Sequence, residues 1–126
     1  MGLDMYAFAF PTVDGQTFDD PKLKCDAPGV EEFMYWRKHP NLHGFMRALY
    51  EQKGGTSEQF NCDWVELDLG DLAKLEEAVT TDSLPETDGF FFGQSTPEDK
   101  AADLKFIAAA REKLKTGKKV YYTSWW

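Results

Sequence analysis

Two short apolar runs, one near each end of the chain, predict buried β-strands. Residues 3–10 are apolar or aromatic at nearly every position and are followed by Pro11, and residues 120–126 are rich in β-branched and aromatic side chains. A strand covered on both faces carries such an uninterrupted run, because neither face meets water. We therefore expect these two strands to lie in the centre of a sheet.

The pattern between residues 30 and 53 predicts helix, interrupted at Pro40. Proline lacks a backbone N–H and disfavours the helical conformation at the residue before it, so the helix should break or kink at His39. The second half has the clearest helical periodicity in the chain, and Gly54 is suited to ending it. The apolar positions of that half are Leu42, Phe45, Met46, Leu49 and Tyr50.

The rest of the chain predicts further strands and helices. We expect a strand within residues 61–67, a helix capped by Asp68, and a third strand over residues 89–93. Thr96 and Pro97 then suit the N-cap and first position of a helix that stops at Gly117.

The predicted order is therefore β-α-β-α-β-α-β within a single domain spanning residues 1–126. The expected fold class is α/β or α+β, with a single small mixed β-sheet of about four strands and three to four helices. Residues 12–29, rich in Asp, Pro and Gly, predict a long acidic loop. Asp4 is an acid within an apolar strand, so it either points to a sheet edge or is buried and paired with Arg37 or Lys38.

The charge balance narrows the classes of partner. The chain of 126 residues has 22 Asp and Glu against 14 Lys and Arg, a net charge of −8. Nucleic acid is an unsuitable direct partner, because attraction to its phosphates comes from basic side chains. The acidic surplus either keeps the domain in solution or attracts a basic protein surface.

No cofactor or metal is predicted. Cys25 and Cys62 belong to no Cys-x-x-Cys or Cys/His cluster. His39 and His43 have a spacing that can bind a metal on one helix, but Pro40 weakens that geometry and no acid of the His-Glu-x-x-His type lies between them. The chain has no signal-peptide pattern and no run long enough to span a membrane, so we expect it in the cytoplasm.

A first candidate ligand site lies around residues 35–43. Trp36 either packs in the core or stacks on a ring of a ligand, and the two cations after it either lie on a solvated face or meet an anion. The residues concerned are Tyr35, Trp36, Arg37, Lys38 and His43.

A second group could complete this site. Gly93, Ser95 and Thr96 precede a predicted helix, where free N–H groups and hydroxyls either cap the helix or receive a phosphate or carboxylate. If Arg37 and Lys38 lay opposite, the pair would suit a nucleotide-like ligand. No residue is assigned a catalytic role, because the serines and cysteines lack an elbow motif or an adjacent base.

The last strand is a candidate interface. Alternate residues of a strand face opposite sides, so its aromatic residues cannot all lie in one core. A helix layer on the second face, a second copy of the chain or a host protein could cover the remaining row, since Tyr and Trp anchor interfaces. The candidate interface residues are Tyr121, Trp125 and Trp126.

The chain resembles a group of small proteins encoded by tailed bacteriophages. The similarity lies in the opening Met-Gly-Leu-Asp-Met-Tyr, then Tyr-Trp-Arg-Lys at 35–38, Gly-Phe-Phe-Phe-Gly at 89–93 and Tyr-Tyr-x-Ser-x-Trp at 121–126. It departs from the group in the acidic insertion at 14–28 and in Gln94. The resemblance implies a phage or prophage origin and a location in the host bacterial cytoplasm, but no established activity.

Two functions follow as hypotheses. The first is a phage accessory protein that binds a host protein, in an interference or anti-defence role. The second is a binder or sponge, or an enzyme, for a small anionic, nucleotide-like ligand. A binding role is favoured over turnover, and a homo-oligomer is compatible with either.

Overall fold

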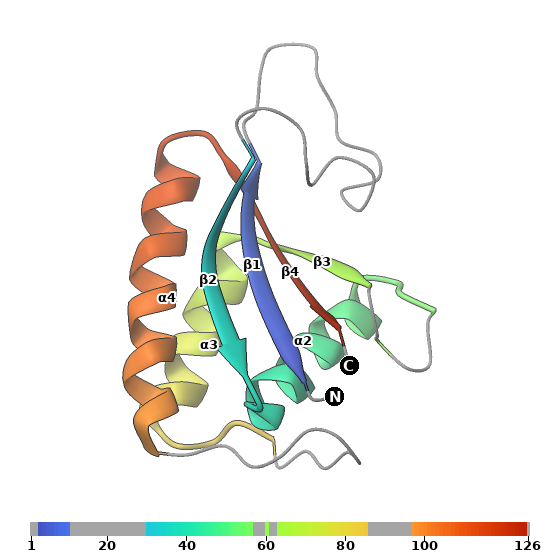
Figure 1. The fold of residues 1–126 in the computed structure, drawn as a ribbon, viewed down its shortest axis with the longest axis vertical. Helices are drawn as coiled ribbons and strands as arrows, with labels where there is room; N and C mark the ends of the chain where they lie inside the picture. The colour runs from blue at the N-terminus through green and yellow to red at the C-terminus, as the bar shows by residue number, and fades with distance from the viewer. Residues whose placement is uncertain (1–2, 11–29, 57–59, 61–62, 86–96, 126) are drawn as a thin grey trace.

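The computed structural model describes residues 3–10, 30–56, 60, 63–85 and 97–125 (Figure 1). Within these residues, four strands form one antiparallel sheet in the order β2-β1-β4-β3. The strands are β1 (Asp4–Phe10), β2 (Glu31–Arg37), β3 (Trp64–Leu67) and β4 (Lys119–Trp125). The helices are α2 (Pro40–Gln52), α3 (Leu69–Thr80) and α4 (Pro97–Lys115).

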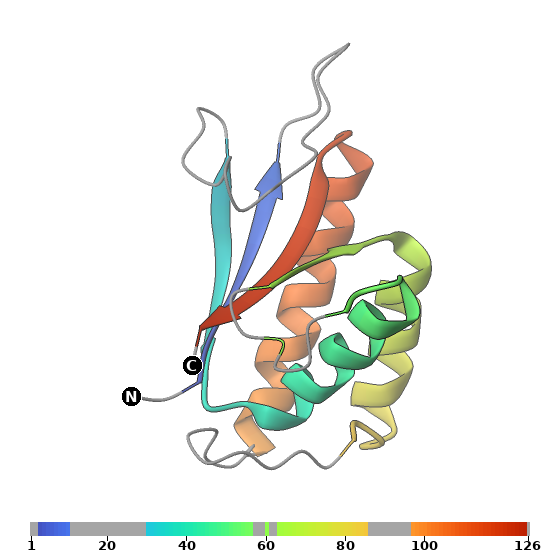
Figure 2. The same cartoon turned by 90° about the vertical axis from the view of Figure 1, so that its right-hand side faces the viewer.

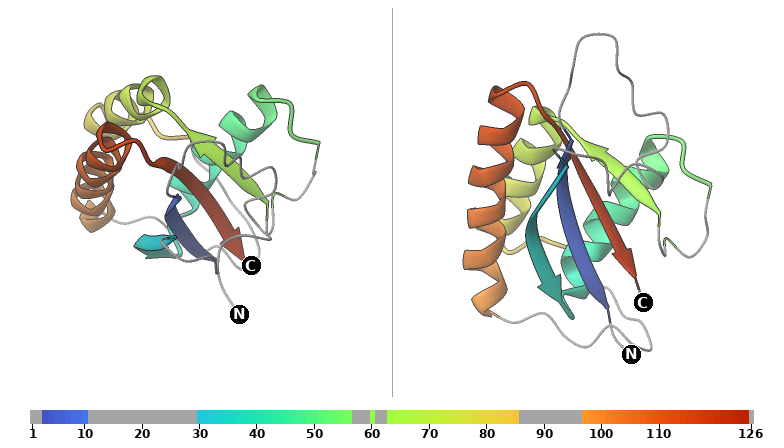
Figure 3. Two further views of the ribbon diagram at one scale, coloured as in Figure 1. Left: turned by 90° about the horizontal axis from the view of Figure 1, so that it is seen from above. Right: turned by 45° about the horizontal axis from the view of Figure 1, so that its top comes forward.

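The three helices lie on one side of the sheet (Figures 2 and 3). Between the two layers lies the hydrophobic core, which takes alternate residues from the strands, Met5 and Ala7 from β1 and Val120 and Tyr122 from β4. The helices contribute the apolar face predicted for α2, together with Leu72, Leu75 and Val79 of α3 and Phe106, Ile107 and Ala110 of α4. The other side of the sheet carries none of the described helices.

The predicted fold class is confirmed. One sheet with helices on one face is an α+β arrangement, and the two apolar strands β1 and β4 occupy its centre. The sheet is antiparallel throughout rather than mixed. The reason is that β2 pairs with β1, the strand before it in the chain, and β4 enters between β1 and β3 in the opposite direction to both.

The prediction of helix for the first part of residues 30–53 is wrong. Residues 31–37 form strand β2, and the helix starts only at Pro40. Three of these seven residues are aromatic (Phe33, Tyr35 and Trp36), a composition that fits a pleated sheet surface better than a helix. Pairing with β1 places Trp36 opposite Met5 and buries its indole, which outweighs the weak local helix preference.

The predicted start of α3 and the predicted end of α4 are confirmed. Asp68 caps α3 in a reciprocal capping box: it accepts a hydrogen bond from the Asp71 N–H at 2.8 Å, and Asp71 accepts one from the Asp68 N–H at 3.0 Å. Gly117 has φ +85° just after α4, the left-handed conformation that glycine adopts at the end of a helix. The predicted strand at 89–93, the Thr96 cap and the loop at 12–29 lie outside the described residues.

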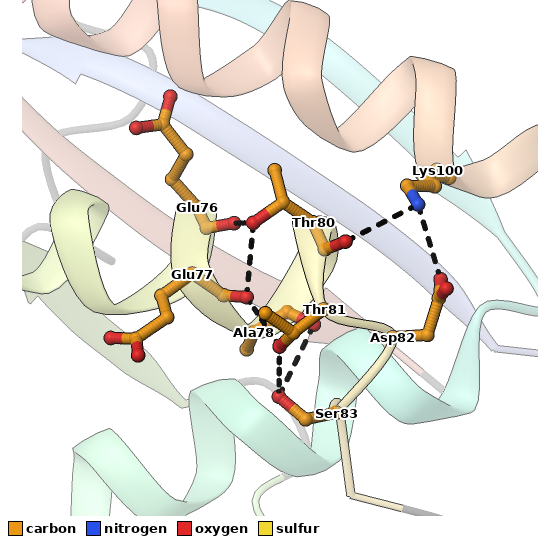
Figure 4. A network of polar contacts seen from close by, with 8 residues as sticks. All are labelled: Glu76, Glu77, Ala78, Thr80, Thr81, Asp82, Ser83 and Lys100. Carbon is orange, nitrogen blue, oxygen red and sulfur yellow. Dashed lines mark hydrogen bonds and ion pairs between the residues drawn. The ribbon is translucent and has the colours of Figure 1, made fainter.

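The end of α3 is closed by hydroxyl groups (Figure 4). Thr80 donates to the carbonyl oxygen of Glu76 at 2.8 Å, and Thr81 donates to that of Glu77 at 2.7 Å. These are bonds from a threonine hydroxyl to the carbonyl oxygen four residues earlier, and the Glu77 carbonyl also accepts the Thr81 N–H at 3.0 Å. Lys100 of α4 reaches the same end, 3.4 Å from the carboxylate of Asp82, and so ties the two helices together.

Candidate functional site

The register of the strands places one set of side chains on the sheet face opposite the helices, which we call the outer face. Because Met5, Ala7, Val120 and Tyr122 lie in the core, the residues that alternate with them point to the outer face. The residues opposite them on the neighbouring strands point to the same face. The outer face holds Asp4, Tyr6, Phe8 and Phe10 of β1, Glu32, Tyr35 and Arg37 of β2, Trp64 and Glu66 of β3, and Lys119, Tyr121, Thr123 and Trp125 of β4.

Six rings on the outer face form a continuous series, the aromatic row. The centroids of Tyr35 and Tyr6 are 5.3 Å apart, and those of Tyr6 and Phe8 are 6.3 Å apart. Phe8 lies 5.2 Å from Trp64, and Trp64 lies 6.1 Å from Phe10. Phe10 meets Tyr121 edge-on at 5.0 Å, which completes the row. These separations and tilted planes are the geometry that aromatic side chains prefer.

A small residue in the middle of β4 allows the row to cross that strand. Thr123 lies opposite both Tyr6 of β1 and Trp64 of β3 in the pairing register. Its short side chain leaves room for the Trp64 indole to reach Phe8 over β4. The Thr123 hydroxyl donates to the carbonyl oxygen of Asp63 at 2.7 Å, so this polar group is satisfied as well.

Exposure falls along the aromatic row. Tyr35 is 48% exposed, while Phe10 and Tyr121 at the opposite end are buried. The three rings between them are partly buried. Trp125, at the Tyr35 end of the outer face, is 65% exposed, the largest value among the exposed apolar side chains of the described residues. Aromatic surface is therefore concentrated at the end of the outer face formed by Tyr35, Tyr6 and Trp125.

Charged groups surround the rings. Asp4 accepts a hydrogen bond from the Tyr35 hydroxyl at 2.5 Å and lies 3.7 Å from the Nε of Arg37. The bond to this carboxylate raises the pKa of Tyr35, so its hydroxyl stays protonated as a donor. Lys119 lies 3.7 Å from Glu66 near the other end. Asp4 is paired with Arg37, as one of the two predictions for it states, but its side chain is 30% exposed rather than buried.

Trp36 is part of the core. Its indole N–H donates to Asp103 at 3.2 Å, and its ring meets Phe106 edge-on at 4.8 Å. The other oxygen of Asp103 lies 2.8 Å from Nε2 of His39. Burial raises the pKa of Asp103, against the opposing effect of its bonds to His39 and Trp36. This buried network joins β2, the start of α2 and α4.

His43 is also buried. A hydrogen bond of 2.8 Å joins its Nδ1 to the hydroxyl of Tyr122, and its ring stacks on Phe60 at 5.1 Å. Burial lowers the pKa of His43 to about 4, with a smaller contribution from the nearby Arg47 cation. His43 is therefore neutral near pH 7. His39 and His43 contact different partners, and within the described residues no group of three or more His, Cys, Asp or Glu is placed to hold a metal ion.

The other residues predicted for the ligand site and for the interface do not come together at one place in the described part of the chain. Arg37 and Lys38 are exposed, and Lys38 has a left-handed backbone (φ +56°) with its N–H bonded to the carbonyl oxygen of Leu3 at 2.8 Å. Tyr121 is buried and Trp125 exposed. Gly93, Ser95, Thr96 and Trp126 lie outside the described residues. The anion site that would join Arg37 to Ser95 therefore stays a prediction.

Four members of the aromatic row were not identified from the sequence: Tyr6, Phe8, Phe10 and Trp64. A signal for three of them was present, because residues 6, 8 and 10 are aromatic at alternate positions, with alanine at 7 and 9. A strand with large rings on one face and small residues on the other indicates two different environments rather than two equally buried faces. The contribution of Trp64 depends on the strand order, which a single sequence does not show.

Comparison with protein-family models, with curated proteins and with solved structures finds no match to this chain. In the described residues no helix combines the length and apolar character needed to cross a membrane.

Proposed function

We propose that this protein acts by binding another protein through the exposed end of its outer face. The observation that supports this most is the aromatic row, six rings in contact that run across the sheet, with the exposed Tyr35 at one end and the exposed Trp125 at the same end of the outer face. In line with the resemblance to phage proteins, we propose a phage or prophage accessory protein whose partner is a host protein.

Tyr35, Tyr6 and Trp125 are the residues expected to contribute most to binding. Tyrosine and tryptophan are enriched among the residues that dominate binding energy, because they bury a large rigid area and lose little conformational freedom. Tyr35 is already held in place by its bond to Asp4 and its contact with Tyr6. Such a pre-ordered side chain loses less entropy when a partner covers it.

The charge of the chain favours a partner with a basic surface. The net charge is −8, and Asp4, Glu32 and Glu66 are distributed over three strands of the outer face. Cationic side chains of a partner could lie over the rings and approach these carboxylates at the same time. Attraction of opposite charges also speeds association, an effect that salt weakens.

The alternative, a binder or enzyme for a small anionic ligand, has less support. Trp36 and His43 are packed in the core with buried hydrogen-bond partners, so neither side chain is presented to a ligand. Arg37 and Lys38 are exposed and remain available for an anion. That alternative would need those two cations and residues 93–96 to converge on one site.

The proposed binding role is tested with a double variant of the exposed aromatic residues, Tyr35→Ala with Trp125→Ala. Proteins captured from a bacterial lysate by the wild-type chain are identified, and the affinity of the main one is then measured by calorimetry. The double variant is expected to lose about 2 kcal/mol of binding free energy, roughly thirtyfold in the dissociation constant.

The matched control is Leu69→Ala, which removes a large apolar side chain that is 55% exposed on α3, away from the outer face. This variant should bind as the wild type does. Equal affinity of all three proteins for the captured partner would show that the outer face is not the binding surface.

A further inference from the structure

Strand β2 forms one edge of the sheet. In the order β2-β1-β4-β3 it pairs only with β1, and no other described strand pairs with its second side (Figure 1). An edge strand presents a series of backbone N–H and C=O groups to which another strand can add. With seven residues, β2 is long enough to support such pairing.

The charges on β2 are sorted by sign along the strand. It begins with Glu31 and Glu32, ends with Arg37 and is followed by Lys38, and all four residues are exposed. Charged side chains normally protect an edge against further pairing. Here a second copy running antiparallel would bring the acidic start of each strand beside the basic end of the other, so the charges would attract instead.

A bulge in β2 places the matching charges on the same face of the sheet. Glu32 and Arg37 are five positions apart, a spacing that puts two residues of a regular strand on opposite faces. The pairing register shifts at Ala7 and Phe8, so Glu32 lies opposite Phe8 and Arg37 opposite Asp4. Phe8 and Asp4 both belong to the outer face, and their partners on β2 therefore share it.

These charges are only partly neutralised by the residues that the structure describes. Glu32 and Lys38 form no ion pair with any residue in the described part of the chain, and the Arg37 side chain is 57% exposed despite its 3.7 Å contact with Asp4. Glu31, in contrast, is bonded to Lys113 of α4. Glu32 and Arg37 are thus the pair best placed to meet across an edge.

We propose that β2 pairs antiparallel with β2 of a second copy of this chain, with Glu32 of each copy beside Arg37 of the other. The two sheets then form one continuous sheet, and the two aromatic rows lie on the same face of it. This proposal is independent of the identity of any other partner.

A charge-swap experiment tests the dimer. Glu32→Lys and Arg37→Glu are prepared separately and studied by sedimentation equilibrium over a dilution series, with circular dichroism to confirm folding. The wild type is expected to dimerise reversibly. Each variant places like charges together twice in its own dimer, and its dissociation constant should rise about tenfold or more.

Mixing the two variants distinguishes pairing from loss of folding. In a mixed dimer the introduced lysine of one copy faces the introduced glutamate of the other, and the native Arg37 of the first faces the native Glu32 of the second. Both contacts are then attractive, so the dimer should return to wild-type affinity. Matched controls are Arg47→Glu and Glu51→Lys, which reverse the charges of an exposed pair on α2 and should leave dimerisation unchanged. A monomeric wild type, or a mixture that stays monomeric, would overturn the proposal.

Discussion

At the scale of single residues, two polar side chains buried in the core contribute to how stability responds to pH. His43 and Asp103 have pKa values shifted by burial, one downward to about 4 and the other upward. Burial disfavours the charged form of both groups, which is why the directions differ between a base and an acid. The two groups therefore contribute to pH dependence with opposite sign.

His43 should make the protein less stable in weak acid. Its pKa in the unfolded chain is near 6.5, so between pH 6.5 and 4 the unfolded state binds the proton more readily. The stability associated with neutral His43 is complete above pH 6.5 and is lost as the pH falls toward 4, by about 3 kcal/mol in all. Urea unfolding at a series of pH values measures this loss.

The control variant for this pH experiment is His43→Asn, which keeps a polar atom near Tyr122 but does not titrate. Its free energy of unfolding should lack the change between pH 6.5 and 4, while the contribution of Asp103 remains. The contribution of Asp103 has the opposite sign. Because its pKa is raised in the folded state, the stability it provides is present at low pH and is lost as the pH rises through that raised pKa. Identical pH profiles for wild type and variant would contradict the assignment.

Asp103 is the residue whose removal should destabilise the core most directly. Asp103→Ala leaves the indole N–H of Trp36 and the ring of His39 without their buried acceptor, which is expected to cost about 3 kcal/mol. Glu51→Ala, which removes an exposed partner of Arg47, should change stability by less than about 0.5 kcal/mol. Chemical denaturation of both variants checks this difference, and a small effect at Asp103 would refute it.

At the scale of elements, the sequence predicts the helices and strands whose local residue pattern agrees with the way they pack in the fold. The capping residue Asp68, the apolar face of α2 and the two apolar strands were all identifiable before the structure. Residues 31–37 were not, because their apolar spacing also allows a helix, and pairing with β1 and burial of Trp36 favour the strand. The aromatic row likewise depends on strands distant in sequence.

The capping box of α3 offers a prediction at this scale. Asp68→Ala removes the acceptor for the Asp71 N–H and should cost about 1 kcal/mol of stability. Asp68→Asn retains an acceptor and should cost clearly less. Bonding to the Asp71 N–H also lowers the pKa of Asp68, so the charged form is favoured in the folded state. Thermal unfolding of the two variants ranks them, and equal losses would argue against the cap.

At the scale of the whole molecule, the two sides of the sheet have different roles. The helices cover one side and provide the core, while the other side carries six rings in contact with decreasing exposure from Tyr35 to Phe10. A sheet with one face buried under helices and a second face of partly exposed aromatic residues is stabilised through the first and can bind through the second. The net charge of −8 then favours a basic partner.

The most direct test of the binding role is native mass spectrometry of the protein purified from a bacterial host. We expect a host protein to be retained by the wild-type chain and by Leu69→Ala, and to be released by Tyr35→Ala with Trp125→Ala. Retention of a small anionic molecule by all three proteins, with no protein partner on any of them, would contradict the binding role and favour a ligand site instead.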